Sequence, residues 1–213
     1  MNGAAMKTSL CAAALALLLV LCAAVGCPAV ANAGEASDQI KGTIDRGIEI
    51  LMRPELQGDA KKSERRALLR KELYPRFDFE EISRRALGVN WKNRTPEEKQ
   101  EFIEVFKTLL ENSYASKVEG YKGERIVYGK EALDLPYAEV RTKIVSGKGE
   151  QFDVNYRALK NGDEWRIYDI VIEGVSLVNN YRSQFTDMLS RYSFEEMMER
   201  LRKTAKAAEE KGG

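Results

Sequence analysis

Residues 164–185, EWRIYDIVIEGVSLVNNYRSQF, form the stretch of sequence that decides the fold. Glu164 to Ile172 has the composition and alternation of a β-strand, Gly174 supplies a tight turn, and an amphipathic helix follows from Ser176. The apolar residues of this helix recur at helical spacing at Leu177, Val178, Tyr181, Phe185, Met188 and Leu189. A strand and a helix joined so closely need partner surfaces from the rest of the chain.

The strand at 164–172 has a predicted hairpin partner at 151–160, because Asn161-Gly162 is a strong signal for a tight hairpin turn. If no bulge intervenes, this turn pairs Ala158 with Trp165, Tyr156 with Ile167, Val154 with Asp169 and Phe152 with Val171. The face defined in this way is apolar except at Asp169.

Asp169 therefore needs an explanation, since a carboxylate on an apolar face is costly unless it is paired or hydrogen bonded. One reading makes it a general base. The other makes it an anchor that accepts hydrogen bonds from Arg182 or from the backbone amides that follow Ser176. The anchor is favoured, because no second titrating partner accompanies Asp169 in the sequence.

Two further strands complete the predicted sheet, at 124–128 and 137–145. The second alternates apolar and charged residues, and Ser146-Gly147-Lys148-Gly149 turns the chain toward 151–160. The helices are expected at 38–52 with Ser37 or Asp38 as N-cap, at 63–74, at 78–87, at 95–121 with a capping box from Thr95, and from Ser193 onward. The predicted fold class is α+β, with a four-stranded antiparallel sheet packed against several helices.

The composition excludes several kinds of chemistry. The chain of 213 residues contains no histidine, and its three cysteines, Cys11, Cys22 and Cys27, all lie near the N-terminus. Without that segment the chain has neither thiol nor imidazole, which excludes disulfides, Cys or His metal sites and nucleophiles that depend on them. The charges nearly balance, at 34 basic against 33 acidic residues, unlike a nucleic-acid-binding protein.

The N-terminal segment has the pattern of a signal peptide. Lys7 provides the positive charge, Leu10 to Val25 is almost entirely apolar, and Ala31-Asn32-Ala33 is a small-x-small cleavage pattern. We expect cleavage after Ala33, leaving 34–213 as a single domain. A membrane anchor is one alternative. A lipoprotein modified at Cys27 is another, although the leucine usual three positions earlier is absent.

The order of motifs along the chain resembles the MlaC family, also known as the toluene-tolerance or Ttg2-type auxiliary proteins. The resemblance covers roughly 38–201, and its most specific part lies near the C-terminus. It is carried by Phe77-Asp78, Leu87-Gly88, Trp91, the helix start at Thr95-Pro96, Trp165, Tyr168-Asp169, Glu173 to Leu177, Asn180-Tyr181-Arg182 and Phe185.

The resemblance implies a soluble periplasmic phospholipid carrier that is not an enzyme. Family members exchange lipid between an outer-membrane lipoprotein complex and an inner-membrane ABC transporter with an MCE-domain subunit. They hold acyl tails in an apolar cavity between sheet and helices, so phospholipid is expected as cargo, with no cofactor, catalytic residue or metal site. A branch of the family found in hopanoid gene contexts remains an alternative.

The predicted lipid contacts combine the sheet face with the long aromatic-rich helix and the helix after Ser176. They are Val140, Ile144, Phe152, Val154, Tyr156, Ile167 and Val171 from the sheet, and Phe102, Phe106, Leu110, Tyr181 and Phe185 from the helices. The predicted anchor comprises Asp169, Arg182, Gly174 and Ser176.

Two rival functions remain open at the level of sequence. One is an NTF2-like enzyme that uses Asp169 with Tyr156 or Tyr168. The other is a lipid-free interaction module whose apolar face docks a partner protein.

Overall fold

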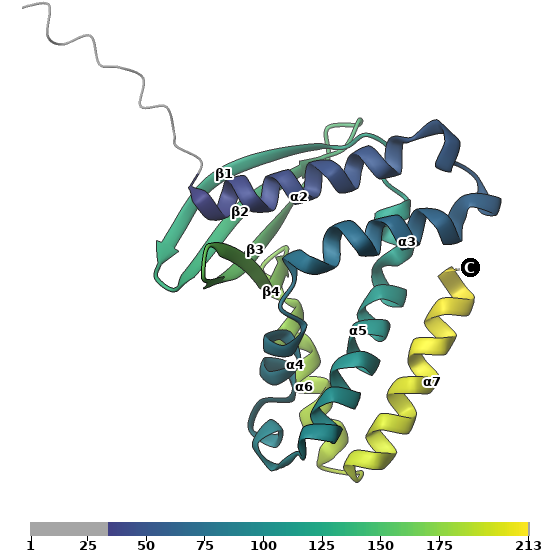
Figure 1. The fold of residues 1–213 in the computed structure, drawn as a ribbon, viewed down its shortest axis with the longest axis vertical. Helices are drawn as coiled ribbons and strands as arrows, with labels where there is room; N and C mark the ends of the chain where they lie inside the picture. The colour runs from purple at the N-terminus through teal and green to yellow at the C-terminus, as the bar shows by residue number, and fades with distance from the viewer. Residues whose placement is uncertain (1–33, 213) are drawn as a thin grey trace, which may run out of the picture. The chain divides into compact units, whose positions relative to one another are not determined.

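The stretch at 164–185 becomes the last long strand and the following helix in the computed structural model, which describes residues 34–212 (Figure 1). The helices are α2 (Glu35–Met52), α3 (Lys62–Leu73), α4 (Phe79–Leu87), α5 (Pro96–Glu119), α6 (Leu177–Leu189) and α7 (Phe194–Gly212). The strands are β1 (Arg125–Asp134), β2 (Tyr137–Val145), β3 (Gln151–Asn161), β4 (Glu164–Ile172) and β5 (Val175–Ser176). The predicted α+β class is confirmed. The predicted signal peptide and Cys27 lie outside the described residues.

The sheet has five antiparallel strands in the order β1-β2-β3-β4-β5. The fifth strand, which the sequence did not predict, is the short segment Val175–Ser176 that pairs with the end of β4. The bounds of β2 and β4 are those predicted, because their alternation is regular. Strand β1 continues to Asp134, well beyond the predicted end at Tyr128, through a register shift between Tyr128 and Glu131.

The predicted register of the β3–β4 hairpin is wrong. Asn161 pairs with Glu164, so the turn lies at Gly162-Asp163, one residue later than expected, with Gly162 at φ 62°. Ala158 therefore pairs with Ile167 instead of Trp165. The register shifts between Arg157 and Ala158, where Arg157 pairs with Asp169, so β4 contains one extra residue in a β-bulge.

Residues paired across strands share a face of the sheet. The extra residue therefore reverses which side chains of β4 point to each face, before and after the bulge. Before it, Ile167 lies on the same face as Ala158 and packs toward α2. After it, Asp169 lies on the same face as Arg157, and Tyr156 pairs with Ile170 on the other. The prediction of one continuous apolar face interrupted by Asp169 is therefore wrong.

Helix α2 crosses the face of the sheet that carries Ala158 and Ile167 (Figure 1). Ala36 and Ile40 are completely buried against Val140 and Trp165 in this α2–sheet cluster. At 25 cal/mol per Å², burial of a side chain such as Ile40 contributes about 2 kcal/mol.

The start of α2 is stabilised by a residue distant in sequence. The N-cap is Gly34, not Ser37 or Asp38 as predicted, and it offers no side-chain bond. Instead, the carboxylate of Glu131 on β1 accepts hydrogen bonds from the backbone N–H of Ser37 at 2.8 Å and from its hydroxyl at 2.7 Å. A negative charge at this position also complements the positive end of the helix dipole.

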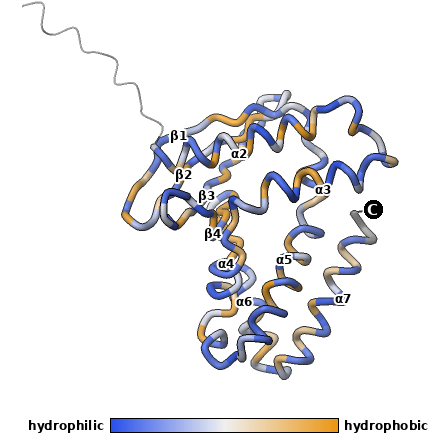
Figure 2. Tube along the Cα trace, in the orientation of Figure 1, coloured by the Kyte–Doolittle hydropathy of each residue, from blue (hydrophilic) through white to orange (hydrophobic). Residues whose placement is uncertain are grey.

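Helices α4, α5, α6 and α7 form a second apolar cluster, whereas α3 packs on the end of α2 in a small third cluster of Ile50, Leu56 and Leu69. Helix α4 packs on α6, α5 packs on α7, and α4 and α6 contact β4. Along these helices the tube in Figure 2 alternates between orange and blue, as expected for amphipathic helices with one buried side. The predicted capping box of α5 is confirmed, because Thr95 accepts from the N–H of Glu98 while the Glu98 carboxylate accepts from the N–H of Thr95.

Replacing Glu131 by alanine should lower the free energy of unfolding by about 1–2 kcal/mol, since two donors at the start of α2 lose their acceptor. Urea unfolding followed by circular dichroism measures this loss. Glu150→Ala, in the exposed β2–β3 loop, is the matched control and should change stability by less than about 0.5 kcal/mol. Equal stability of the two variants would contradict the proposed long-range cap.

Candidate functional site

The Asp169 carboxylate sits at the junction of β4 and α6 and is only 4% exposed. One oxygen accepts from the backbone N–H of Val178 at 3.0 Å. The other accepts from the Ser176 hydroxyl at 2.6 Å and from the Arg157 guanidinium at 3.2 Å. These three donors satisfy both carboxylate oxygens, and the charge is offset by an arginine and by the N-terminus of α6.

Ser176 serves Asp169 and α6 together. Its hydroxyl donates a hydrogen bond to Asp169 and accepts one from the backbone N–H of Asn179 at 3.0 Å. Ser176 is therefore the N-cap of α6 and also a hydrogen-bond donor to the carboxylate. The preceding turn places Gly174 at φ 78°, in the left-handed region that favours glycine. The turn therefore places the first residues of α6 next to the end of β4.

Arg182 does not supply the cation for Asp169. Its Nε donates instead to the carbonyl of Arg85 near the end of α4, at 2.7 Å, so it links α6 to α4. The cation is Arg157, which the sequence reasoning missed because the bulge that places it opposite Asp169 leaves no clear sequence signal.

Arg157 is shared between two carboxylates, since it also lies 3.4 Å from Glu139 on β2. Burial tends to raise the pKa of Glu139, but hydrogen bonds from Arg141 and Arg157 outweigh it, and the pKa lies below its ordinary value. The face of the sheet opposite α2 thus carries a row of alternating charges, formed in order by Arg141, Glu139, Arg157 and Asp169.

The predicted lipid contacts from the helices all lie in the second cluster. Phe102, Phe106 and Phe185 are at most 1% exposed, and their rings contact one another with centroids 5.1–5.5 Å apart. Leu110 and Tyr181 are only partly buried and pack against this cluster. The three phenylalanines therefore form a packed core, and Leu110 and Tyr181 lie at its margin.

The predicted lipid contacts from the sheet do not share one face. Val140 and Ile167 are buried in the α2–sheet cluster, with Tyr156 packed beside it. Val154 pairs with Thr142 on the same face. The bulge puts Val171 on the opposite face, paired with Asn155.

The remaining two sheet residues lie near the other end of the strands. Ile144 is half-buried and pairs with Phe152, whose side chain is 39% exposed. They are therefore more accessible than the buried residues of the cluster.

The sequence reasoning also missed contributions to the apolar face from α2 and β1. Ile40 and Ile44 of α2 and Tyr128 of β1 pack in or against the α2–sheet cluster. The helical stripe of α2 was visible in the sequence, but nothing there indicated which surface it covers.

Two shallow surface hollows lined by described residues lie elsewhere. One, of about 570 Å³, lies along the first turns of α5 beside Pro96 and Glu101. The other, of about 290 Å³, lies between α5 and α7 beside Asn112 and Ala205. Neither is lined by a predicted lipid contact.

Within 34–212 there is no group of three or more Asp, Glu, His or Cys side chains placed to bind a metal ion. No helix of this same region combines the length and apolar character needed to cross a membrane.

Comparison with known proteins adds the decisive observation. The family model described as MlaC protein matches residues 41–203, which is most of the chain. The chain belongs to the MlaC family. The resemblance based on the motifs is thereby confirmed.

Two curated relatives of the family are similar over part of their length. The intermembrane phospholipid transport system binding protein MlaC of Haemophilus influenzae is 24% identical over 145 residues, covering 66% of this chain and 68% of that protein. The toluene tolerance protein ttg2D of Pseudomonas putida is 30% identical over 121 residues, covering 56% of each.

A solved relative shares the fold over almost its entire length. The phospholipid-binding protein from Ralstonia solanacearum, determined in complex with a phospholipid, superposes with a TM-score of 0.74 at 27% identity. The similarity covers 82% of this chain and 99% of that chain.

The Asp169→Asn variant should lose about 2–3 kcal/mol of unfolding free energy, because an amide cannot accept from all three donors and leaves Arg157 without its buried partner. Urea unfolding measures the loss. Asp153→Asn is the matched control on β3, since its ion pair with Lys143 is about half-exposed and contributes little. Similar stability of the two variants would rule out the anchor.

Proposed function

We propose that this chain is a periplasmic phospholipid carrier that moves lipid between outer-membrane and inner-membrane complexes. The observation that carries the proposal is the similarity of nearly the whole described fold to a protein solved with a bound phospholipid, within a family that the chain shares. Phospholipid is then cargo, and the chain needs no cofactor.

The physical requirement for such a carrier is large. A diacyl lipid exposes about 30 methylenes, and at about 0.8 kcal/mol each its transfer from membrane to water costs on the order of 20 kcal/mol. A carrier removes this barrier by offering an apolar environment comparable to the bilayer. If the environment were much more favourable, the lipid would not be released.

The half-buried apolar side chains are the best candidates for contact with acyl tails. Ile144 and Tyr156 on the sheet, with Leu110 and Tyr181 on the helices, are accessible in part while the packed phenylalanines are not. We propose that acyl tails contact side chains of both groups.

The export and partner assignments rest on the same family. A signal peptide at 1–33, cleavage after Ala33 and a single lipid-binding domain at 34–213 are consistent with a periplasmic role. The proposed partners are an outer-membrane lipoprotein complex and an inner-membrane ABC transporter with an MCE-domain subunit. The names of the two curated relatives support phospholipid transport and toluene tolerance, and they do not favour a hopanoid role.

An NTF2-like enzyme is not favoured by the geometry. Both oxygens of Asp169 are already bound by donors, and the bulge places Tyr156 and Asp169 on opposite faces of the sheet. The Arg85 guanidinium stacks over the ring of Tyr168, 4.1 Å from the ring centroid, so Tyr168 takes part in a cation–π contact that stabilises the fold.

Purified protein should contain phospholipid in roughly equimolar amount. Native mass spectrometry should show the complex, and denaturing mass spectrometry should release and identify the lipid. Protein that is always empty, and that extracts no lipid from phospholipid vesicles, would refute the carrier function. Exclusive recovery of a hopanoid would favour the alternative branch.

Ile144→Trp should reduce lipid extraction from vesicles several-fold while changing stability by less than about 1 kcal/mol, because the site is only half-buried. Val140→Trp, on the same strand and face but completely buried, should instead destabilise the fold by about 3 kcal/mol or more. Vesicle extraction and urea unfolding measure the two effects. Normal extraction by Ile144→Trp would show that this end of the sheet does not contact lipid.

A further inference from the structure

The hydroxyl of Tyr128 is a buried donor that the fold does not use. Its oxygen is shielded from solvent, and no group among residues 34–212 forms a hydrogen bond with it. A buried hydroxyl without a partner costs about 1–3 kcal/mol, so a residue of this kind calls for an explanation.

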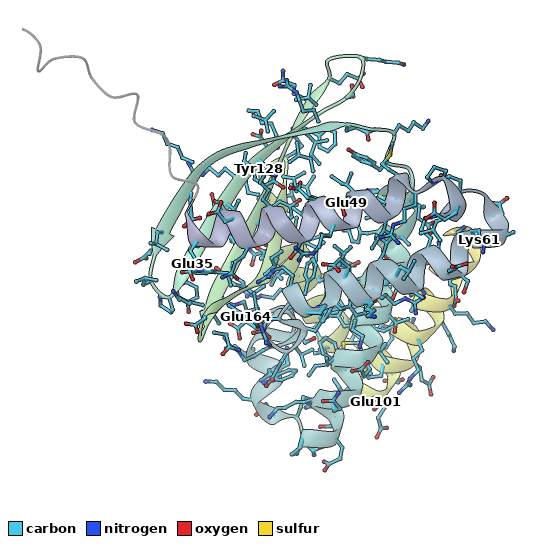
Figure 3. The ribbon with its side chains drawn as sticks, turned by 45° about the horizontal axis from the view of Figure 1, so that its top comes forward. Glu35, Glu49, Lys61, Glu101, Tyr128 and Glu164 are labelled. Carbon is cyan, nitrogen blue, oxygen red and sulfur yellow. The ribbon has the colours of Figure 1, made fainter. Side chains whose placement is uncertain are left out.

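The backbone fixes the position of this hydroxyl. Tyr128 pairs with Thr142 immediately before the register shift of β1, which places it on the face of the sheet that α2 crosses. Its ring packs against the α2–sheet cluster, and Figure 3 labels it among the strands beside α2. The Lys41 ammonium group lies 5.7 Å from the ring centroid, on the α2 side.

Thr142 and Lys41, which lie beside Tyr128, already have partners of their own. The Thr142 hydroxyl donates to the carbonyl of Val154, and Lys41 is paired with Asp45. Tyr156 lies on the same face, and burial raises its pKa to about 12. Burial also raises the pKa of Tyr128, with smaller contributions from Tyr156 and Asp45, so both phenols are neutral at pH 7.

The chemistry of the required partner follows from these surroundings. The α2–sheet cluster that Tyr128 packs against is apolar and includes Ile44 of α2 and Val140 of β2, so a buried phosphate would be costly without a free cation. A neutral carbonyl oxygen accepts a hydrogen bond and brings no charge. In a glycerophospholipid, such carbonyls lie at the ester groups where the acyl tails begin.

We propose that the Tyr128 hydroxyl donates a hydrogen bond to an ester carbonyl of a bound glycerophospholipid. The inference rests on the proposed carrier function and adds a specific recognition contact to it. The bond sets the depth to which the tails enter the protein, because it holds the glycerol end of the lipid at β1.

The test compares wild type with Tyr128→Phe, using a diester phosphatidylglycerol and its diether analogue with the same chains and headgroup. Wild type should bind the diester about three- to tenfold more tightly, since the ether lacks the carbonyl acceptors. Tyr128→Phe should lose that factor for the diester and bind both lipids equally.

Lipid-free Tyr128→Phe should unfold at the same temperature as wild type or at a higher one, because it no longer buries an unpaired hydroxyl. Weaker binding combined with undiminished stability separates a lipid contact from a structural one. Tyr137→Phe is the matched control, because Tyr137 is 40% exposed and next to the buried Ala138, so it projects from the opposite face. It should retain the diester preference.

A second measurement does not depend on any variant. The infrared band of a carbonyl-labelled diester lipid should shift to lower wavenumber on binding to wild type, relative to the same lipid in an apolar solvent. An unshifted band overturns the inference.

The inference also fails, while the carrier function stands, if wild type binds diester and diether equally or if Tyr128→Phe keeps full diester affinity. If wild type binds neither lipid, the inference and the carrier function fail together.

Discussion

The extra residue in β4 is the constraint on which the rest of the structure depends. Because the strand turns over at the bulge opposite Arg157, its first half packs against α2 and its second half binds the start of α6. A regular strand would direct Ile167 and Asp169 to the same face and would place a carboxylate among the apolar side chains of α2. Because of the bulge, β4 contributes Ile167 to the α2–sheet cluster and packs Tyr168 against the cluster of α4 to α7, while Asp169 binds the start of α6.

The bonds at Asp169 and the contacts in the two clusters contribute in different ways. Hydrogen bonds from Ser176, Val178 and Arg157 are directional and fix where α6 begins relative to β4. Apolar contacts are non-directional and tolerate changes in side-chain arrangement. In the proposed carrier this division is useful, since polar bonds hold the framework while apolar side chains adapt to acyl tails of varied length.

The sequence predicted the positions of most helices and strands, but not which side chains share a face of the sheet. Alternation located β2 and β4, and the Thr95 signal located the start of α5, because both depend on neighbours close in sequence. The bulge could not be predicted from the sequence, because Trp165, Ile167 and Val171 keep the two-residue spacing of a regular strand on both sides of it. Arg157 and Tyr128 were missed for the related reason that their importance depends on pairing between strands. The motif resemblance, which needs no geometry, identified the family.

The contact between Glu131 and Ser37 has a consequence for the order in which the chain assembles. The two residues are 94 positions apart. A chain that emerges N-terminus first therefore exposes the segment of α2 long before its acceptor on β1 exists. The same holds for Ile40, whose partners Val140 and Trp165 come later still. Helix α2 can therefore pack on α3, which follows it directly, but its contacts with the sheet form only after β1 to β4 have been made.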